Sequence, residues 1–252
     1  MKAIEILLEI IERQDWISFR SAALSNPAYF QAITKAIASC PECNGMTLLH
    51  AVVRCNPPLD VVGKMMEMCP YLPAAKDCLG RTPLHVAAGS AAAPRLIKLI
   101  AHAHPASCDA QDEDGKTPLH FACDITCELF EDSTPTEQAP REVCHDTIRA
   151  LLSESIYAST IEDLDEMNAV EYAIMSDAPL KTIKLLQVAS CRSFESSQLP
   201  IQSPIQMLSL TQRKRPVSTT PLRVSYKEDE IMWKTGMFSY RRRQNSYIRI
   251  ID

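Results

Sequence analysis

Three histidines, His50, His85 and His120, follow one another at intervals of 35 residues and are the first candidates for chemistry. Imidazole nitrogens bind metal ions and move protons near neutral pH. Helices of neighbouring packed units lie about 8–10 Å apart, whereas zinc holds a histidine nitrogen at about 2 Å. One ion cannot reach all three side chains, so we expect no metal site here.

Two cysteines, Cys40 and Cys43, have the spacing of half a zinc site or of a redox pair. A structural zinc needs four ligands, and the nearest third candidate is Cys78, one repeat further along. A thioredoxin-like site would need a βαβ pattern, which the sequence lacks. A thiol-redox or zinc-responsive regulator that uses these three cysteines stays an alternative hypothesis.

The chain has 10 cysteines and no secretory signal, which favours a reducing compartment without disulfides. We expect four of them to serve as small buried hydrophobic residues: Cys55, Cys69, Cys123 and Cys144. No run of 18 apolar residues occurs, so we expect no membrane span. The expected location is the cytoplasm, and entry into the nucleus stays open.

Catalysis has no visible basis in the sequence. The chain has 6 glycines, of which three belong to tight turns, and the remaining three are too few for a phosphate-binding loop. No nucleophile motif and no pair of acid and base carboxylates is found. We therefore expect a protein that is not an enzyme and has no catalytic residues, no cofactor and no metal.

The histidines belong to a recurring phrase, which is most complete at Thr82-Pro83-Leu84-His85. An aspartate and a glycine precede it, as in a tight turn. Threonine suits a helix N-cap and proline the first helical position. The phrase recurs at residues 45–52 and 115–123, and each copy is followed by a second helical pattern, at residues 59–66, 94–100 and 145–152. Each unit therefore reads as turn, helix, helix.

This phrase resembles the signature of the ankyrin-repeat family, T-P-L-H-x-A, which is complete in residues 82–87 and 117–122. The copy at residues 47–52 departs from it, with Leu48 for the proline and Val52 for the final alanine. The resemblance implies that each histidine ties the turn to the helix by hydrogen bonds. It also implies a module that binds another protein.

We expect an all-α ankyrin-repeat solenoid in residues 1–190, with an atypical N-terminal cap repeat in residues 1–38. Repeats follow at about 42–76, 77–111, 112–162 and 163–190. The last copy is degenerate and acts as a closing cap, with Asn168 for the threonine and Glu171 for the histidine. The third copy has an inserted loop, residues 128–142, which we expect to be solvated and dispensable for folding.

Residues 191–252 form a basic tail rich in Ser, Thr, Pro and Gln, which we expect to be largely irregular. The tail has 11 Lys and Arg against 5 Asp and Glu, whereas residues 1–190 have 15 against 26, so the net charges are +6 and −11. This balance disfavours nucleic-acid binding by the repeats. It also suggests that residues 227–249 dock on acidic turn residues of the array: Glu113, Asp114, Asp163, Asp165 and Glu166.

The resemblance implies a non-enzymatic scaffold that contacts a partner protein of unknown identity through turn tips and the faces of the first helices. By match to the motif, the contact residues are Cys78, Leu79, Arg81, Glu113, Asp114 and Lys116. The less complete copies add Cys43, Asn44 and Met46, and Asp163, Asp165 and Met167. A regulatory subunit of an enzyme complex would have the same sequence features and stays a second alternative.

Overall fold

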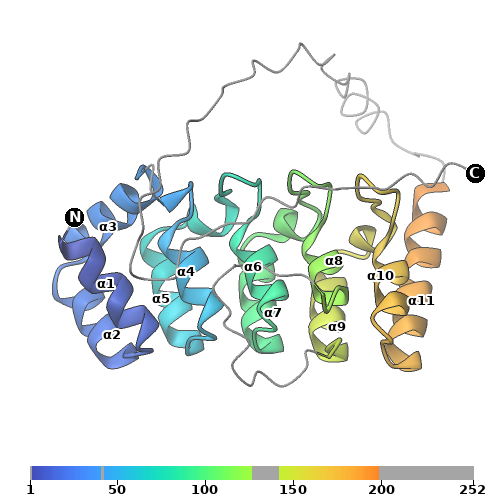
Figure 1. Cartoon of the computed structure of the whole chain (residues 1–252), viewed down its shortest axis with the longest axis horizontal. Coiled ribbons are helices and arrows are strands. Elements are labelled where there is room, and N and C mark those ends of the chain that lie inside the picture. The colour runs from blue at the N-terminus through green and yellow to red at the C-terminus, as the bar shows by residue number, and fades with distance from the viewer. Residues whose placement is uncertain (1, 41–42, 127–141, 199–252) are drawn as a thin grey trace, which may run out of the picture.

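The computed structural model describes residues 2–40, 43–126 and 142–198. Within these residues the regular secondary structure is helical. A single isolated β-bridge joins Glu162 and Asn168. The helices stand side by side in chain order and form one elongated array (Figure 1). The predicted all-α solenoid is confirmed.

Three helices form the N-terminal end of the array: α1 (Lys2–Glu12), α2 (Trp16–Ser25) and α3 (Pro27–Ala38). Asp15 caps α2 by accepting a hydrogen bond from the Ser18 amide at 3.0 Å. Asn26 caps α3 in the same way, through the Tyr29 amide at 3.0 Å. These caps separate helices that follow one another with almost no linker.

Four pairs of antiparallel helices follow, each made of a short helix and a longer one. The short helices are α4 (Leu48–Arg54), α6 (Pro83–Gly89), α8 (Pro118–Cys123) and α10 (Ala169–Met175). The longer ones are α5 (Leu59–Met68), α7 (Pro94–Ala103), α9 (His145–Glu154) and α11 (Leu180–Gln198). Short 3₁₀ turns lead from three of the longer helices towards the next unit: η2 (Leu72–Ala74), η3 (Pro105–Cys108) and η4 (Tyr157–Thr160).

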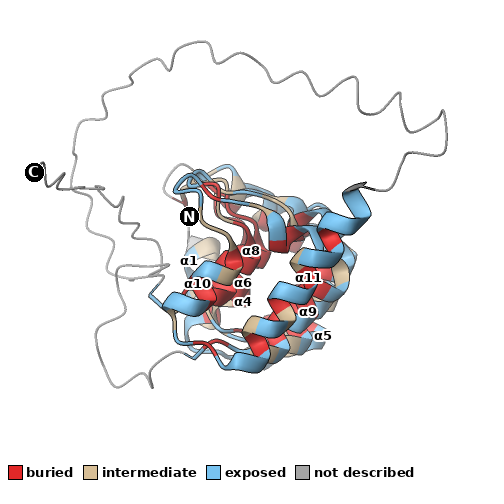
Figure 2. Cartoon of the chain, turned by 90° about the vertical axis from the view of Figure 1, so that its right-hand side faces the viewer, coloured by how far each residue is buried: buried red, intermediate tan, exposed pale blue. Residues whose placement is uncertain are grey.

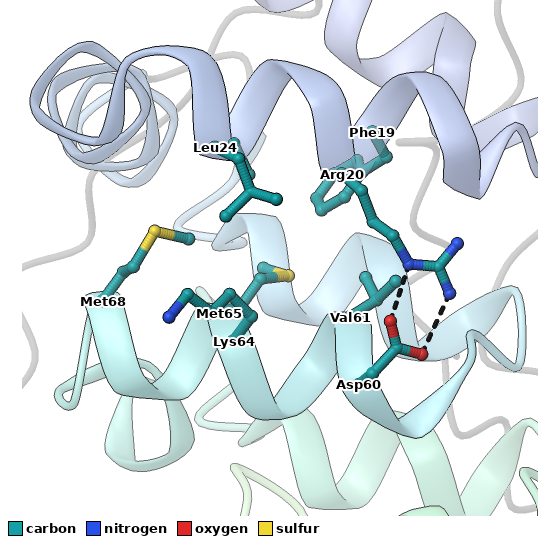
Figure 3. A pocket seen from close by; sticks show the side chains of 9 residues that line it. Phe19, Arg20, Leu24, Asp60, Val61, Lys64, Met65 and Met68 are labelled. Atoms are coloured by element: carbon teal, nitrogen blue, oxygen red, sulfur yellow. Dashed lines mark hydrogen bonds and ion pairs between the residues drawn. The ribbon is translucent and has the colours of Figure 1, made fainter.

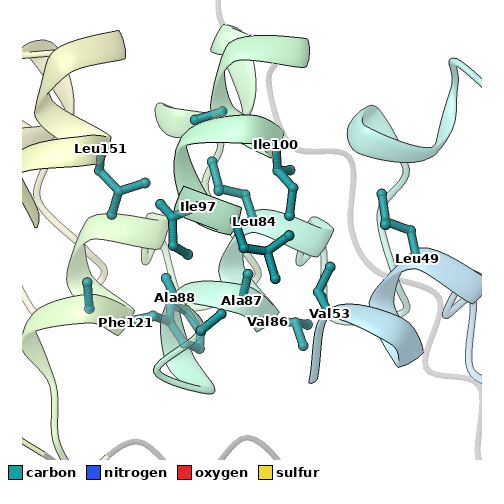
Figure 4. Close-up of a cluster of buried hydrophobic side chains, with 14 of the residues drawn as sticks. Leu49, Val53, Leu84, Val86, Ala87, Ala88, Ile97, Ile100, Phe121 and Leu151 are labelled. Carbon is teal, nitrogen blue, oxygen red and sulfur yellow. The ribbon is translucent and has the colours of Figure 1, made fainter. Parts of the chain in front are cut away.

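The core runs continuously through the array because each unit buries its apolar side chains against both neighbours. Leu84 of α6 is completely buried and lies near Ile97 and Ile100 of α7 (Figure 4). Its neighbours Ala87 and Ala88 are small, which lets adjacent helices approach closely. The short helices are almost entirely core, and every residue of α6 and α8 is buried.

The structure differs from the predicted domain bounds at the end of α11, and it does not describe two of the predicted segments. Helix α11 continues to Gln198, past the expected end of the array at residue 190. Residues 127–141, which include most of the inserted loop, lie outside the described residues, and so does the tail from residue 199. The predictions made for these segments therefore stay predictions.

Replacing Leu84 by Asp should abolish cooperative folding. The substitution removes apolar burial of about 1.5–3 kcal/mol and places a carboxylate without a partner in the core. Urea denaturation followed by circular dichroism measures the effect. Leu164→Asp is the control, because Leu164 is 74% exposed, and it should unfold like the parent. Equal midpoints for Leu84→Asp and the parent would show that Leu84 does not support the core.

Candidate functional site

The second, third and fourth turns each begin with an aspartate that organises the turn. One oxygen of Asp77 accepts hydrogen bonds from the amides of Leu79 at 3.0 Å and Arg81 at 2.9 Å. Asp112 accepts from the amides of Asp114 and Lys116 at 3.0 and 2.8 Å. Asp163 does the same with Asp165 and Met167 at 2.9 and 3.0 Å. A short carboxylate that bonds its own backbone fixes the shape of each turn.

Each buried histidine links the helix of its unit to the turn of the next. His85 accepts a hydrogen bond at Nδ1 from the Thr82 amide at 3.0 Å. Its Nε2 therefore holds the proton and donates to the Lys116 carbonyl of the next unit, at 3.1 Å. The matching bonds run from His50 to the Arg81 carbonyl at 3.0 Å and from His120 to the Met167 carbonyl at 3.2 Å. The structural role that the resemblance implied is confirmed, and it extends between repeats.

Burial keeps these imidazoles neutral. It lowers the pKa of His50 to about 4 and that of His85 to about 3, and it also lowers the pKa of His120. Both ring nitrogens are engaged in hydrogen bonds. The histidines are therefore committed to the framework and are unsuited to metal binding or proton transfer.

The turns also bond directly to one another, and glycine makes this possible. The Glu113 amide donates to the Leu79 carbonyl at 2.9 Å, and the Leu164 amide donates to the Asp114 carbonyl at 2.9 Å. Gly115 has φ +78°, and a Cβ there would lie 2.9 Å from the Leu164 nitrogen. Gly80 and Gly45 also have positive φ and a similarly close next turn. We call this stack of bonded turns the turn ladder.

A family model described as ankyrin repeats (many copies) matches residues 75–122, which contain the second and third copies of the phrase. Residues 75–122 contain ankyrin repeats. No curated protein matches the chain. Ankyrin repeats generally act as protein–protein interaction modules and are typically not enzymes.

The fourth ankyrin unit keeps the helix cap but loses the link to a further unit. Asn168 and Glu171 cap α10 reciprocally, and the backbone N–H of Asn168 donates to the Glu171 carboxylate at 2.7 Å. Glu171 stands where the earlier units have the bridging histidine. Glu166 stands where they have glycine, and it has φ 59°. Glu171 lacks the imidazole that bonds the next turn in the earlier units, and Glu166 lacks the open space that glycine leaves for that turn.

Most of the predicted contact residues lie on the turn ladder, but not all are accessible. Cys78, Glu113 and Asp114 are exposed, and Leu79 is half-buried. Arg81 is 4% exposed, because its Nε donates to the Asp77 carboxylate at 2.9 Å. The assignment of Arg81 to the contact surface is therefore corrected: its side chain braces the turn from inside.

Lys116 is also largely committed to internal contacts. Its side chain is 16% exposed, and Nζ lies 3.4 Å from an Asp124 carboxylate oxygen and 4.5 Å from the centre of the Tyr172 ring. The Tyr172 hydroxyl donates to Asp163 at 2.6 Å. These contacts join the third and fourth units by a cation–π contact and a hydrogen bond. Lys116 thus contributes little to any outer contact.

The less complete copies need similar corrections. Cys43 and Met46 are 5% and 1% exposed, so they belong to the core rather than to a contact surface. Asn44 is half-buried, as is Met167. Asp163 is 7% exposed, and its carboxylate accepts a hydrogen bond from the Asp165 backbone amide of the same turn. Because α6 and α8 are fully buried, the expectation that first-helix faces supply contacts is wrong for these two helices.

Sequence reasoning missed some exposed residues of the fourth unit. Leu164 is 74% exposed and occupies the position of Cys78 and Glu113 in the aligned turns. Ile174 and Met175, at the end of α10, are 53% and 71% exposed. The alignment of the turns pointed to Leu164, whereas nothing in the sequence distinguished the end of α10 from the buried ends of α6 and α8.

The cysteines of the described segments form no group that could hold a metal ion. Cys40 is half-buried and Cys43 is buried, while the pKa of the Cys78 thiol is raised by burial and by the nearby Asp77 carboxylate. Across residues 2–40, 43–126 and 142–198, no three His, Cys, Asp or Glu side chains gather to hold a metal ion. The thiol or zinc alternative thus gains no support from the described residues.

Two of the four cysteines expected in the core, Cys69 and Cys123, are indeed buried. Cys55 is half-buried, and Cys144 is exposed at the N-cap of α9. The expectation is therefore wrong for Cys144, because the N-cap residue lies just before the helix, outside its buried face.

A pocket of about 210 Å³ opens between α2 and α5 (Figure 3). Its walls are mainly apolar, with Phe19, Leu24 and Met65 among them, and Arg20 makes a two-bond ion pair with Asp60 at its edge, at 2.6 and 2.9 Å. Sites for small organic ligands usually measure about 300–1,000 Å³. The pocket is too small for a typical cofactor.

None of the helices in the described part of the chain has the length and apolar character needed to cross a membrane.

Replacing Gly115 by Ala should destabilise the protein by about 1–3 kcal/mol, because it adds a positive-φ penalty and a clash with the next turn. The matched control is Gly63→Ala in α5, where an added Cβ meets nothing within 4 Å. That change should stabilise the helix by about 0.5–1 kcal/mol. Chemical denaturation of both variants gives the comparison. Equal effects of the two substitutions would contradict the close stacking of the turns.

The free energy of unfolding should fall as the pH drops from 6.5 towards 4. The unfolded chain takes up protons on His50, His85 and His120 in this range, whereas the folded protein holds their pKa values lower. The slope is up to about 1.4 kcal/mol per pH unit for each histidine. Burial raises the pKa of Asp112 to about 6, which acts in the opposite sense for one proton.

Urea denaturation between pH 7 and pH 4.5 measures this slope. His85→Asn should lower stability at pH 7 and flatten the slope. His102→Gln is the control, since the His102 side chain is 81% exposed, and it should leave the slope unchanged. A slope that His85→Asn does not alter would contradict the neutral histidine bridge.

Proposed function

We propose that this ankyrin array holds a partner protein through the exposed tips of its turn ladder. The proposal rests on the general role of ankyrin repeats in protein–protein interaction. It is supported by the hydrogen bonds that join successive turns, such as Glu113 to Leu79 and Leu164 to Asp114. A surface that is already ordered loses little conformational entropy on binding.

The observation that carries the proposal is the distribution of charge along these rigid tips. Among the described residues of the first and second turns, Asn44 and Lys76 carry no negative charge, whereas Glu42 of the first turn lies outside the described part of the chain. Glu113 and Asp114 are exposed on the third turn, and Asp165 and Glu166 on the fourth. The tips of the third and fourth units thus present carboxylates on a fixed spacing. We expect the partner to meet them with a basic segment, since complementary charge speeds association and sets orientation.

Helix α10 extends this surface beyond the tips. Glu171 is exposed near its start, and Ile174 and Met175 are exposed at its end. Apolar side chains at the centre of an interface usually contribute more free energy than charged ones at its rim. In this proposal the carboxylates select and orient the partner, while the end of α10 supplies apolar contact.

The basic tail of the same chain is a competitor for this surface. Residues 227–249 lie outside the described residues, so their docking stays a prediction. The structure changes the expected target, because Asp163 is buried and only Glu113, Asp114, Asp165 and Glu166 remain accessible. Exposed ion pairs are worth about 0–1 kcal/mol each and are screened by salt. A partner with stronger apolar contacts would displace the tail.

The test is quantitative affinity capture from cell extract with the full chain and two charge-reversed variants. Glu113→Lys with Asp114→Lys alters the turn ladder, while Glu5→Lys with Glu12→Lys makes the same change of charge on exposed positions of α1. We expect specific binding proteins to be retained by the α1 variant and reduced about tenfold or more by the tip variant, since several charge contacts are lost.

Circular dichroism of both variants controls for folding. If the tip variant and the α1 variant capture the same proteins in equal amounts, the turn tips are not the binding surface. Loss of binding in both variants alike would show attraction to net charge rather than to this site.

A further inference from the structure

The last helix exposes an apolar face at the end of the array. On α11, Leu180 is 65% exposed, Val188 48% and Phe194 62%, and Cys191 is exposed among them. At about 100° per residue these four side chains fall within roughly a third of the helix circumference, an arc that they share with the exposed polar side chains of Lys184, Gln187 and Glu195. Figure 2 views the molecule from this end, with α11 nearest the viewer and much of its outer side exposed. Such a face on a terminal helix calls for a covering segment.

A fifth ankyrin unit in the same register cannot be that cover. At Gly115 the next turn comes so close that a Cβ would lie 2.9 Å from its backbone, and Glu166 has a side chain at the equivalent position. Glu171 also lacks the N–H with which each histidine bonds the following turn. The end of the array is therefore closed at the turns but open along α11, and its cover must lie on the helix alone.

The end of α11 is held firmly where the chain leaves it. This helix has 19 residues, compared with 10 each for α5, α7 and α9. Its extra turns lie against η4, where the Ser190 hydroxyl donates to the Ser159 carbonyl at 3.1 Å and Ser193 lies 3.3 Å from Thr160, hydroxyl to hydroxyl. These contacts hold the C-terminal part of α11, including Phe194, against η4.

We propose that residues 199–210 of this same chain fold back and cover the outer face of α11. This segment lies outside the described residues and is known here from its sequence. It has no charged residue, and six of its members are apolar: Leu199, Ile201, Ile205, Met207, Leu208 and Leu210. A proline at position 200 disfavours helical backbone at the residue before it, so the sequence predicts that the chain can change direction just after α11. The segment is thus apolar where the rest of the tail is basic.

The length of the segment matches the helix it would cover. Helix α11 has 19 residues and at 1.5 Å per residue measures roughly 28 Å. Twelve extended residues reach at most about 40 Å, enough to return from Gln198 towards Leu180. Direct attachment holds the segment at an effective concentration of order millimolar. A second copy of the chain, at ordinary concentrations, would compete poorly for this face.

Alkylation of Cys191 in the full chain tests the proposal, because this thiol lies in the middle of the covered face. The native protein is treated with iodoacetamide, and peptide mass spectrometry gives the rate for each cysteine. Ile205→Asp with Leu208→Asp should expose the face and speed the reaction of Cys191 about tenfold, as expected from losing two apolar contacts. The exposed Cys144 of the same molecule should react at an unchanged rate.

The matched control is Ile248→Asp with Ile250→Asp, which adds the same charges to the tail outside residues 199–210. This variant should leave the Cys191 rate at the parent value. If Cys191 reacts as fast in the parent as in the Ile205 and Leu208 variant, the segment does not cover α11. Protection of Cys191 that disappears on dilution would also overturn the proposal, because a second copy would then be the cover.

Discussion

The buried imidazole bridge is the interaction on which the rest of this structure depends. In the first three repeats a neutral histidine accepts from the backbone amide of its own N-cap residue and donates to a carbonyl of the next turn. These groups lie in a low-dielectric interior, where an unmade hydrogen bond costs about 1–3 kcal/mol. The bridges therefore set the register of each unit against the next, and the glycines and turn aspartates complete that register.

The consequence for binding is a surface defined by backbone rather than by side chains. The positions of Glu113 and Leu164 at the tips are set by their own amides, which bond the preceding turns. Their side chains are then free to vary without disturbing the fold. Helices α6 and α8, by contrast, bury all their residues and offer no such freedom. This division explains how one framework can carry tips of different charge along its length.

The sequence predicted the framework well because the framework is local. Thr82, Pro83 and His85 lie within four consecutive positions, and the cap they form depends on little beyond their own backbone. The accessibility of side chains was harder to predict, because it depends on neighbours distant in sequence. Arg81 matched the contact position of the motif, yet its guanidinium turns inward to Asp77. The ammonium group of Lys116 lies over the ring of Tyr172, a residue that follows the inserted loop and is distant in the sequence.

The bridges also give the array a direction. Each histidine donates towards the C-terminal neighbour, so a unit needs its own imidazole and glycine only if another unit follows it. The fourth unit has Glu171 and Glu166 at these two positions and keeps a complete helix cap. These two residues thus mark the fourth unit as the last one that the array can stack in this register. An engineer who wished to lengthen this protein would restore a histidine at 171 and a glycine at 166 before appending further units, and would leave the first three repeats untouched.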